Sequence, residues 1–339
     1  MTNPRLTMNL RIGIVSTLRG AEKMIDSFIL YHRAVGFDHL FLFFDDPDDP
    51  AIDRAQHHEA VTIIPHDAHL RRQWQASTLF AAGFIDEVMG RQTLNLELAI
   101  GLAAEHGLDW LLHIDQDELF YSARQSVHDH FADLTVRNVA CAEYPNHEAV
   151  PEQIDLDDFF RHATLFKKAA SARAVPDFDD RQKALLQAMP QLGLRFFHFY
   201  TGVKSAARVQ PGLRPFGTHK FKPPPGSLTA TARTDPVILH YPCCGFGHFW
   251  DKFTILGARP YTWWGRDATD RLGLFFRDAL AIGRQGDRQA ARAFYAHRYV
   301  LADEADAAVL IEHDLCCRIT EPARILENMG ANPADFDDV

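Results

Sequence analysis

Three acidic side chains stand close together in residues 110–120, WLLHIDQDELF. Asp115, Asp117 and Glu118 follow a run of mostly apolar residues, and the residues after them are apolar again. Side chains two apart on an extended segment point to the same side, so Asp115 and Asp117 can face one site while Gln116 faces away. Two carboxylates on one side repel each other unless a cation or hydrogen-bond donors lie between them. Because carboxylate oxygens suit Mg²⁺, Mn²⁺ and Ca²⁺, the pattern predicts a site for a divalent cation.

The alternative is that these acids only solvate a loop or cap the following helix. The apolar runs on both sides favour the metal site, because they place the acids at the end of a buried strand. A divalent ion held by one or two carboxylates usually completes its coordination with water and with the phosphates of a ligand. The segment is therefore typical of a site for a phosphate-bearing ligand.

The first half of the chain alternates between expected strands and expected helices. Strands are expected at residues 11–16, 39–44, 61–64 and 110–114. Helices are expected at residues 21–35, 77–89 and 92–106. Alternating strands and helices indicate a parallel sheet covered on both faces, and such sheets bind ligands at the carboxyl ends of their strands. Asp45 and Asp46 follow the second strand, so we expect them on the same edge as Asp115 and Asp117.

Beyond residue 130 the pattern is less regular. Strands are expected at residues 136–144, 204–209 and 237–241, a loop at 221–234, and three helical stretches from residue 268 onward. No hard domain boundary is visible. We expect a catalytic domain over residues 1–258, with a nucleotide-binding half at 8–125 and an acceptor half at 126–258, followed by a helical C-terminal extension over 259–339.

Composition limits the class of protein. The 339 residues are 47% hydrophobic and 24% charged, as in an ordinary globular protein, and the net charge of -10 argues against a general nucleic-acid binder. No apolar run is long enough for a transmembrane segment, and the N-terminal residues show no secretory signal. The five cysteines include no CxxC pair. We therefore expect a cytoplasmic protein. Peripheral contact with a membrane is compatible with this expectation.

Several segments together resemble the GT-A glycosyltransferases, most closely the family 2-like and family 92-like members. Residues 109–120, DWLLHIDQDELF, resemble their W-[LIF]-x-x-x-D-x-D-E-[FL] segment. Residues 14–52 resemble their first strand, a helix with a W/Y-H-x-x-x-G-[FV] ending, and a second strand that ends in acids. Residues 237–253, VILHYPCCGFGHFWDKF, resemble a strand ending in H-Y that precedes a helix with a lysine. The segment TLRGAE departs from the family, because it lacks the usual polar pair after the first strand.

The resemblance implies a mixed α/β, Rossmann-like sheet flanked by helices. It implies a metal-dependent glycosyltransferase that moves a sugar from a nucleotide-diphosphate sugar to a carbohydrate or glycan acceptor, with inversion expected. The implied metal ligands for Mn²⁺ or Mg²⁺ are Asp115, Asp117 and His240, although His240 would also suit a buried core position. The implied nucleotide-sugar-binding residues are Thr17, Asp45, Asp46, Asn95, Asp115, Gln116, Lys204 and Arg208.

The group that deprotonates the acceptor stays open. An inverting transfer needs a base for the acceptor hydroxyl, and Glu143 and His219 are the candidates. A retaining enzyme would need no such base. Two other classes also stay open: a nucleotidyltransferase of sugar metabolism, and a non-catalytic protein that binds nucleotide sugars or carbohydrates.

Overall fold

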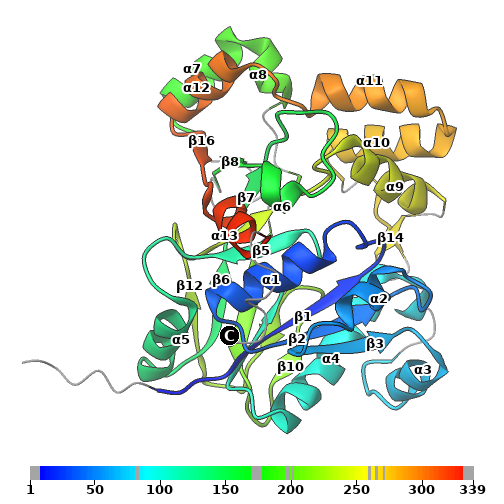
Figure 1. Cartoon of the computed structure of the whole chain (residues 1–339), viewed down its shortest axis with the longest axis vertical. Coiled ribbons are helices and arrows are strands. Elements are labelled where there is room, and N and C mark those ends of the chain that lie inside the picture. The colour runs from blue at the N-terminus through cyan, green and yellow to red at the C-terminus, as the bar shows by residue number, and fades with distance from the viewer. Residues whose placement is uncertain are drawn as a thin grey trace, which may run out of the picture.

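The structure, a computed structural model, describes residues 8–80, 84–168, 178–195, 199–200, 202–258, 261–263, 266–269 and 272–330. Its larger sheet has the spatial strand order β12-β6-β9-β4-β1-β2-β3 (Figure 1). These strands are β1 (Ile12–Leu18), β2 (His39–Phe44), β3 (Val61–Pro65), β4 (Trp110–His113), β6 (Val139–Tyr144), β9 (Lys204–Arg208) and β12 (Leu228–Thr231). Neighbours among β1 to β4 run parallel, whereas β9 runs antiparallel to both β4 and β6.

Helices cover both faces of this sheet. They are α1 (Ile25–Val35), α2 (Ala51–Ala55), α3 (Ala68–Gln75), α4 (Val88–Glu105) and α5 (Val127–Val136), with a 3-10 turn η1 (Phe84–Asp86) before α4. One core cluster joins one sheet face to α1, α2 and α5, and a second joins the other face to α3 and α4. Burial on both faces explains why the central parallel strands are almost wholly apolar.

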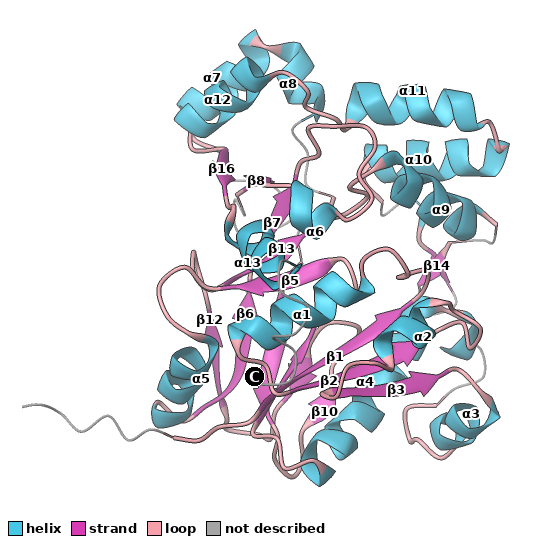
Figure 2. Ribbon diagram, in the orientation of Figure 1, coloured by secondary structure: helices cyan, strands magenta, loops and turns pink. Residues whose placement is uncertain are grey.

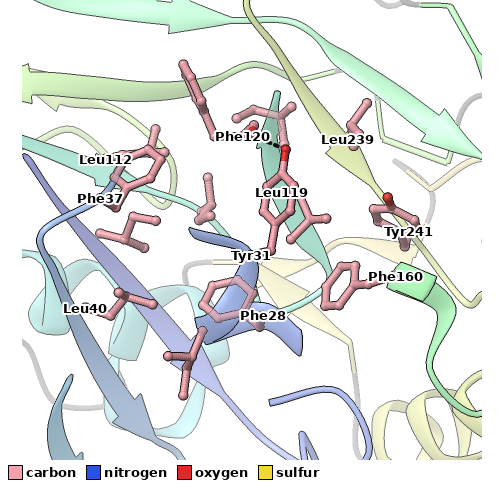
Figure 3. Packing of buried hydrophobic residues seen from close by; sticks show 14 of the residues in the cluster. Phe28, Tyr31, Phe37, Leu40, Leu112, Leu119, Phe120, Phe160, Leu239 and Tyr241 are labelled. Atoms are coloured by element: carbon pink, nitrogen blue, oxygen red, sulfur yellow. Dashed lines mark hydrogen bonds between the residues drawn. The ribbon is translucent and has the colours of Figure 1, made fainter. Parts of the chain in front are cut away.

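A second sheet, in the order β16-β8-β7-β13-β5, lies beside the first (Figure 2). Its strands are β5 (Glu118–Tyr121), β7 (Asn146–Ala149), β8 (Leu165–Lys167), β13 (Val237–His240) and β16 (Cys316–Arg318). The two sheets share a core, because Phe120 of β5 and Leu239 of β13 pack in the same cluster as Phe28 and Tyr31 of α1 (Figure 3). The Tyr31 hydroxyl donates a hydrogen bond to the Phe120 carbonyl at 3.0 Å.

Eight further helices and two short strand pairs complete the described part of the fold. The helices are α6 (Phe159–His162), α7 (Asp180–Ala188), α8 (Pro190–Arg195), α9 (Phe246–Gly257), α10 (Leu274–Gln285), α11 (Arg288–Arg298), α12 (Glu304–Glu312) and α13 (Glu321–Gly330). The short strand pairs are β10 (Arg214–Pro215) with β11 (Phe221–Lys222), and β14 (Thr262–Trp263) with β15 (Arg266–Asp267). Helices α9, α10 and α11 pack through an aromatic cluster, whereas α13 returns to α1 and α6. No helix in the described part of the chain is both long and apolar enough to cross a bilayer.

The predicted mixed α/β sheet flanked by helices is confirmed, but three local predictions are wrong. Residues 77–89 do not form one helix, because their described part holds turns, η1 and only the first residues of α4. The expected loop at 221–234 contains the strands β11 and β12. Four helices, not three, follow residue 268 among the described residues, and β16 lies between the last two. The division at residue 258 stays a prediction.

Candidate functional site

The acidic segment is the crossover between the two sheets. Strand β4 ends at His113 in the first sheet, and β5 begins at Glu118 in the second, so Asp115 and Asp117 lie on the connection. Because β9 runs antiparallel to β4, Ser205 lies opposite His113 and Lys204 reaches the carboxyl end of β4. The topology thus brings a lysine from 89 residues away to the predicted edge.

Asp115 lies in a closed network with Lys204. The Lys204 ammonium donates to Asp115 Oδ2 at 2.5 Å and lies 2.8 Å from Glu118 Oε1, and Gln92 Nε2 donates to Asp115 Oδ1 at 2.8 Å. Burial raises the pKa of the Asp115 carboxyl, but Lys204 and His219 together more than offset burial, so the net pKa lies below its usual range. Burial raises the pKa of Glu118, even against the attraction of Lys204. One cation therefore lies between two carboxylates here, and it does not fully compensate both of them.

Asp117 faces the second sheet and has looser contacts. The Lys252 ammonium, on α9, donates to Asp117 Oδ2 at 3.2 Å, and His240 Nε2 lies 3.9 Å from the same oxygen. Burial raises the pKa of Asp117, and the Lys252 ammonium and His240 more than offset it, so the pKa is lowered. The same ion pair raises the pKa of Lys252 against the effect of burial. Asp117 is therefore charged at neutral pH.

His240 lies in a row of polar side chains that crosses the second sheet. In the strand register, His240 lies opposite Glu118 of β5 on one side and Glu148 of β7 on the other. His240 Nδ1 is 3.7 Å from Glu148 Oε1. The buried Glu148 carboxylate also accepts hydrogen bonds from the backbone N–H groups of Phe199 and Tyr200, at 2.7 and 2.5 Å. These bonds fix Glu148, and Glu148 in turn favours an orientation of His240 with Nε2 toward Asp117.

Asp117 and His240 fit a divalent cation as a pair. Metal-binding histidines usually present their second nitrogen to a carboxylate, which is how His240 faces Glu148. Asp115 fits less well, because both of its oxygens already accept hydrogen bonds. In the described part of the chain, no group of three or more His, Cys, Asp or Glu side chains is arranged to hold a metal. Phosphate and water oxygens would therefore have to complete the coordination, as is common for Mg²⁺.

Three of the predicted nucleotide contacts make hydrogen bonds within the protein. Asn95 donates to the Thr17 hydroxyl at 3.0 Å and accepts from Trp74 Nε1 at 3.1 Å, so it links β1 to α3. The Gln116 amide donates to the Arg19 carbonyl and accepts from the Arg19 N–H. Gln116 thereby fastens the loop after β1 to the crossover between the sheets.

The acids after β2 differ from each other. Both Asp45 oxygens accept from the Arg91 guanidinium, with a distance of 2.6 Å from Nε to Oδ1, and both side chains are buried. Asp46 accepts from the Asp48 N–H at 3.1 Å, which is a turn contact. The Asp45 carboxylate is therefore engaged by Arg91, so a direct contact with a nucleotide would have to replace that pairing.

Arg208 does not join the site. It lies opposite Trp110 in the strand register, at the amino end of β4, whereas Lys204 lies at the carboxyl end. Four residues of extended chain separate the two basic side chains by about 13 Å. Arg208 was expected at the site because a fixed cation complements a phosphate oxygen, but the antiparallel direction of β9 places it at the opposite edge.

The two candidate bases lie near the same edge. His219 Nε2 is 3.8 Å from Asp115 Oδ2, and burial together with the Lys204 ammonium lowers the pKa of His219 well below its usual range. Glu143 lies opposite Ser205 in the register, and its carboxylate accepts from the Lys220 ammonium at 2.9 Å. At neutral pH His219 is therefore a neutral imidazole, and its lowered pKa makes it a weaker base than an ordinary histidine.

Four functional candidates were missing from the sequence-based set: Arg91, Gln92, Glu148 and Lys252. Arg91 and Gln92 sit on α4, and no local pattern shows that their partners are acids on β2 and β4. Glu148 becomes visible only through its register with His240. The sequence did offer a way to find Lys252, since the resemblance includes a lysine on the helix after the strand that ends in H-Y.

Comparison with known proteins gives relatives at low identity. No protein-family model matches the chain. Two proteins of Arabidopsis thaliana, both named glycosyltransferase-like, are each 25% identical to it over 93% of its length. The matches cover 71% and 62% of those proteins, so part of each relative has no counterpart in this chain.

Solved structures give weaker similarities. Core-mannan synthase A from Aspergillus fumigatus, in its Mn/GDP form, is 12% identical with a TM-score of 0.30, over 61% of this chain and 62% of that chain. HddC from Yersinia pseudotuberculosis is also 12% identical with a TM-score of 0.30, over 68% of this chain and 93% of that chain. Scores this low carry no argument about the site.

Proposed function

We propose that the chain is a glycosyltransferase that moves a sugar from a nucleotide-diphosphate sugar to a carbohydrate or glycan acceptor. The observation that carries the proposal is the crossover between the two sheets, where Asp115 and Asp117 each face a lysine at the carboxyl edge of parallel strands. This edge is where open α/β sheets bind their ligands. The names of the two Arabidopsis relatives and the GT-A-like sequence segments support the same class of activity.

The charges at the crossover suit a diphosphate. A lysine ammonium complements a phosphate oxygen, and Lys204 and Lys252 approach the crossover from two different elements. We propose a divalent ion, Mn²⁺ or Mg²⁺, at Asp117 and His240. When bound, the ion supplies positive charge that stabilises the departing nucleoside diphosphate without any proton transfer. The protein's part is to hold Asp117 and His240 in place, which Glu148 supports through its backbone hydrogen bonds.

We propose inversion, with one side chain removing the proton of the acceptor hydroxyl. His219 and Glu143 are the two candidates, and variants separate them. If His219 is the base, His219→Gln should lower turnover with little change in donor affinity. If Glu143 is the base, Glu143→Gln should have that effect instead. A base acts on the acceptor proton only in the transition state, so its loss affects kcat more than donor binding.

The acceptor class and the compartment are further parts of this proposal. A glycan acceptor would approach beside β6 and β9, where Glu143 and the neighbour of His219, Lys220, are paired. All five cysteines are free thiols, four of them buried. Free thiols support a reducing compartment such as the cytoplasm.

Donor hydrolysis tests the proposed activity. The protein is incubated with Mn²⁺ and, separately, UDP-glucose, UDP-galactose, UDP-N-acetylglucosamine or GDP-mannose, and the released nucleoside diphosphate is quantified. We expect release from at least one donor, and Asp117→Ala should lower it at least about a hundredfold, since it removes a proposed metal ligand. Asp117 lies on a connection and not in the apolar core, so this variant should keep its melting midpoint.

The matched control is Asp48→Ala, the same change at an exposed acid after β2. It should release nucleotide at the wild-type rate. If no donor releases nucleotide, or if Asp117→Ala is as active as Asp48→Ala, the proposed function is wrong.

A further inference from the structure

The two lysines at the crossover are held with different strength. Lys204 contacts two carboxylates, Asp115 at 2.5 Å and Glu118 at 2.8 Å, and its side chain is 1% exposed. Lys252 contacts one carboxylate, Asp117 at 3.2 Å, and its side chain is 25% exposed. The Lys204 ammonium is therefore locked into the protein, whereas only one ion pair holds the Lys252 ammonium.

Lys252 occupies the oxygen that a metal ion would need. Its ammonium lies 3.2 Å from Asp117 Oδ2, the same oxygen that faces His240 Nε2 at 3.9 Å. A divalent ion between Asp117 and His240 would bring two or more positive charges beside this ammonium, and like charges at such distances repel strongly in a partly buried site. The ion and the lysine therefore compete for Asp117.

The Lys252 side chain is long enough for its ammonium to move away from Asp117. It lies on α9 (Phe246–Gly257) with its side chain partly exposed, and a lysine has a flexible four-carbon stem. The Phe199 ring lies 5.1 Å from its ammonium and adds a second, weaker contact. A strongly anionic ligand beside the crossover would offer a better partner than a shared carboxylate.

We propose that Lys252 is an exchangeable cation: it neutralises Asp117 when no donor is bound, and it moves to the donor diphosphate when a divalent ion takes its place. This inference rests on the proposed function and extends it to the order and coupling of binding. Metal binding frees the ammonium for the diphosphate, and diphosphate binding draws the ammonium away from Asp117. Each ligand therefore raises the affinity for the other, by the same factor in both directions. No covalent bond changes in this exchange.

Metal titration of lysine variants tests the exchange. The binding of Mn²⁺ is measured by electron paramagnetic resonance, with and without UDP or GDP, for the wild type and Lys252→Met. We expect Lys252→Met to bind Mn²⁺ alone roughly tenfold more tightly than the wild type, which is within the usual range of coupling between sites. In the variant, the nucleotide should bind more weakly in the presence of Mn²⁺, and it should increase Mn²⁺ affinity by a smaller factor than in the wild type.

Two controls separate competition from a general change in charge. Lys220→Met removes the same charge next to His219, but from an ammonium paired with Glu143, and should leave Mn²⁺ affinity within about twofold of the wild type. Lys252→Arg keeps the charge and should keep weak Mn²⁺ binding. Lys252→Gln replaces Lys252→Met if the methionine variant does not fold.

The outcomes distinguish this inference from the proposed function. Equal Mn²⁺ affinity in wild type and Lys252→Met overturns the exchange, and so does the absence of Mn²⁺ binding in both; donor turnover in either case would leave the proposed activity intact. Tighter Mn²⁺ binding in Lys252→Met, with no nucleotide bound by any variant, would keep the competition at Asp117 but remove both the diphosphate step and the proposed donor.

Discussion

The two aspartates of the crossover are only two residues apart, yet they belong to regions of different construction. Asp115 faces the first sheet, where Lys204 and Gln92 occupy both of its oxygens and Glu118 closes the network. Asp117 faces the second sheet, where its carboxylate contacts one partly exposed lysine and lies almost 4 Å from a histidine. Asp115 is therefore part of a closed hydrogen-bond network, whereas Asp117, at the same edge, has a carboxylate with fewer contacts.

The difference separates what builds the site from what can exchange there. Removing either partner of a buried ion pair leaves an uncompensated charge in the interior, which is costly. A buried pair whose atoms have no other partners therefore holds one geometry. A pair that is partly exposed and has one contact can break at small cost. We infer that the Asp115 network fixes the path of the chain between the sheets, and that the Asp117 contact is where ligands act.

The largest effect that tests this comparison concerns stability. Lys204→Met should lower the free energy of unfolding by about 3–5 kcal/mol, because Asp115 and Glu118 lose the one cation between them. Lys252→Met should lower it by a smaller amount, about 1–2 kcal/mol, because Lys252 is partly exposed and neutralises one buried carboxylate, not two. Urea denaturation at pH 8 measures both. Equal losses in the two variants would contradict the division into a closed and an open region.

A smaller expected loss of stability concerns His32 of α1, which accepts a hydrogen bond from β5. Its Nδ1 donates to the Phe28 carbonyl at 2.8 Å, and its Nε2 accepts from the Phe120 N–H at 3.3 Å. His32→Leu leaves the buried Phe120 N–H without this partner and should cost about 1–3 kcal/mol at pH 7.5. The exposed His128→Leu is the matched control and should cost about 0.5 kcal/mol or less.

The same histidine gives a prediction for pH. Burial lowers the pKa of His32 to about 3, so the folded protein keeps it neutral while the unfolded chain binds a proton below about pH 6.5. Its contribution to stability is complete above that pH and is lost as the pH falls toward the folded pKa, by up to about 1.4 kcal/mol per pH unit. The deficit of His32→Leu relative to wild type should therefore shrink from pH 7.5 to pH 4.5. A deficit that stays constant would show that His32 is not held neutral.

The sequence predicted best where an apolar run or a special backbone position decides the structure. The strand at residues 39–44 was predicted with the bounds that β2 has, because its apolar residues are buried and the acids after it end the strand. Gly36 directly follows the expected helix at residues 21–35, which is the position of a C-cap glycine, and it adopts a φ of 108°, which favours glycine. Helix α3 was missed, since AHLRRQWQ is short and has only two large apolar residues, Leu70 and Trp74, although their spacing of four suits a helix.

The sequence predicted that Asp115 and Asp117 lie at one edge of the sheet, but it did not predict most of their partners; that this edge is a binding site stays a prediction. Asp115, Asp117, Lys204 and His240 lie at strand ends, and the topology brings them to one crossover. Arg91, the partner of Asp45, and Lys252, the partner of Asp117, sit on helices far from those acids in sequence. A single charge on a helix is more often solvated than paired. Which partner a buried charge finds depends on register and strand direction, which a local pattern does not contain.

The account's central claim is that this crossover binds the diphosphate of a nucleotide sugar, and calorimetric titration tests it most directly. UDP-glucose, GDP-mannose, free glucose and free mannose are titrated in Mn²⁺ into the wild type and Asp117→Asn, which keeps the side-chain shape and removes the charge. We predict that at least one nucleotide sugar binds the wild type, that the free sugars bind far more weakly, and that Asp117→Asn weakens the nucleotide sugar at least about tenfold. Free sugars that bind as tightly as the nucleotide sugars, or a nucleotide sugar that binds Asp117→Asn as tightly as the wild type, would contradict the claim.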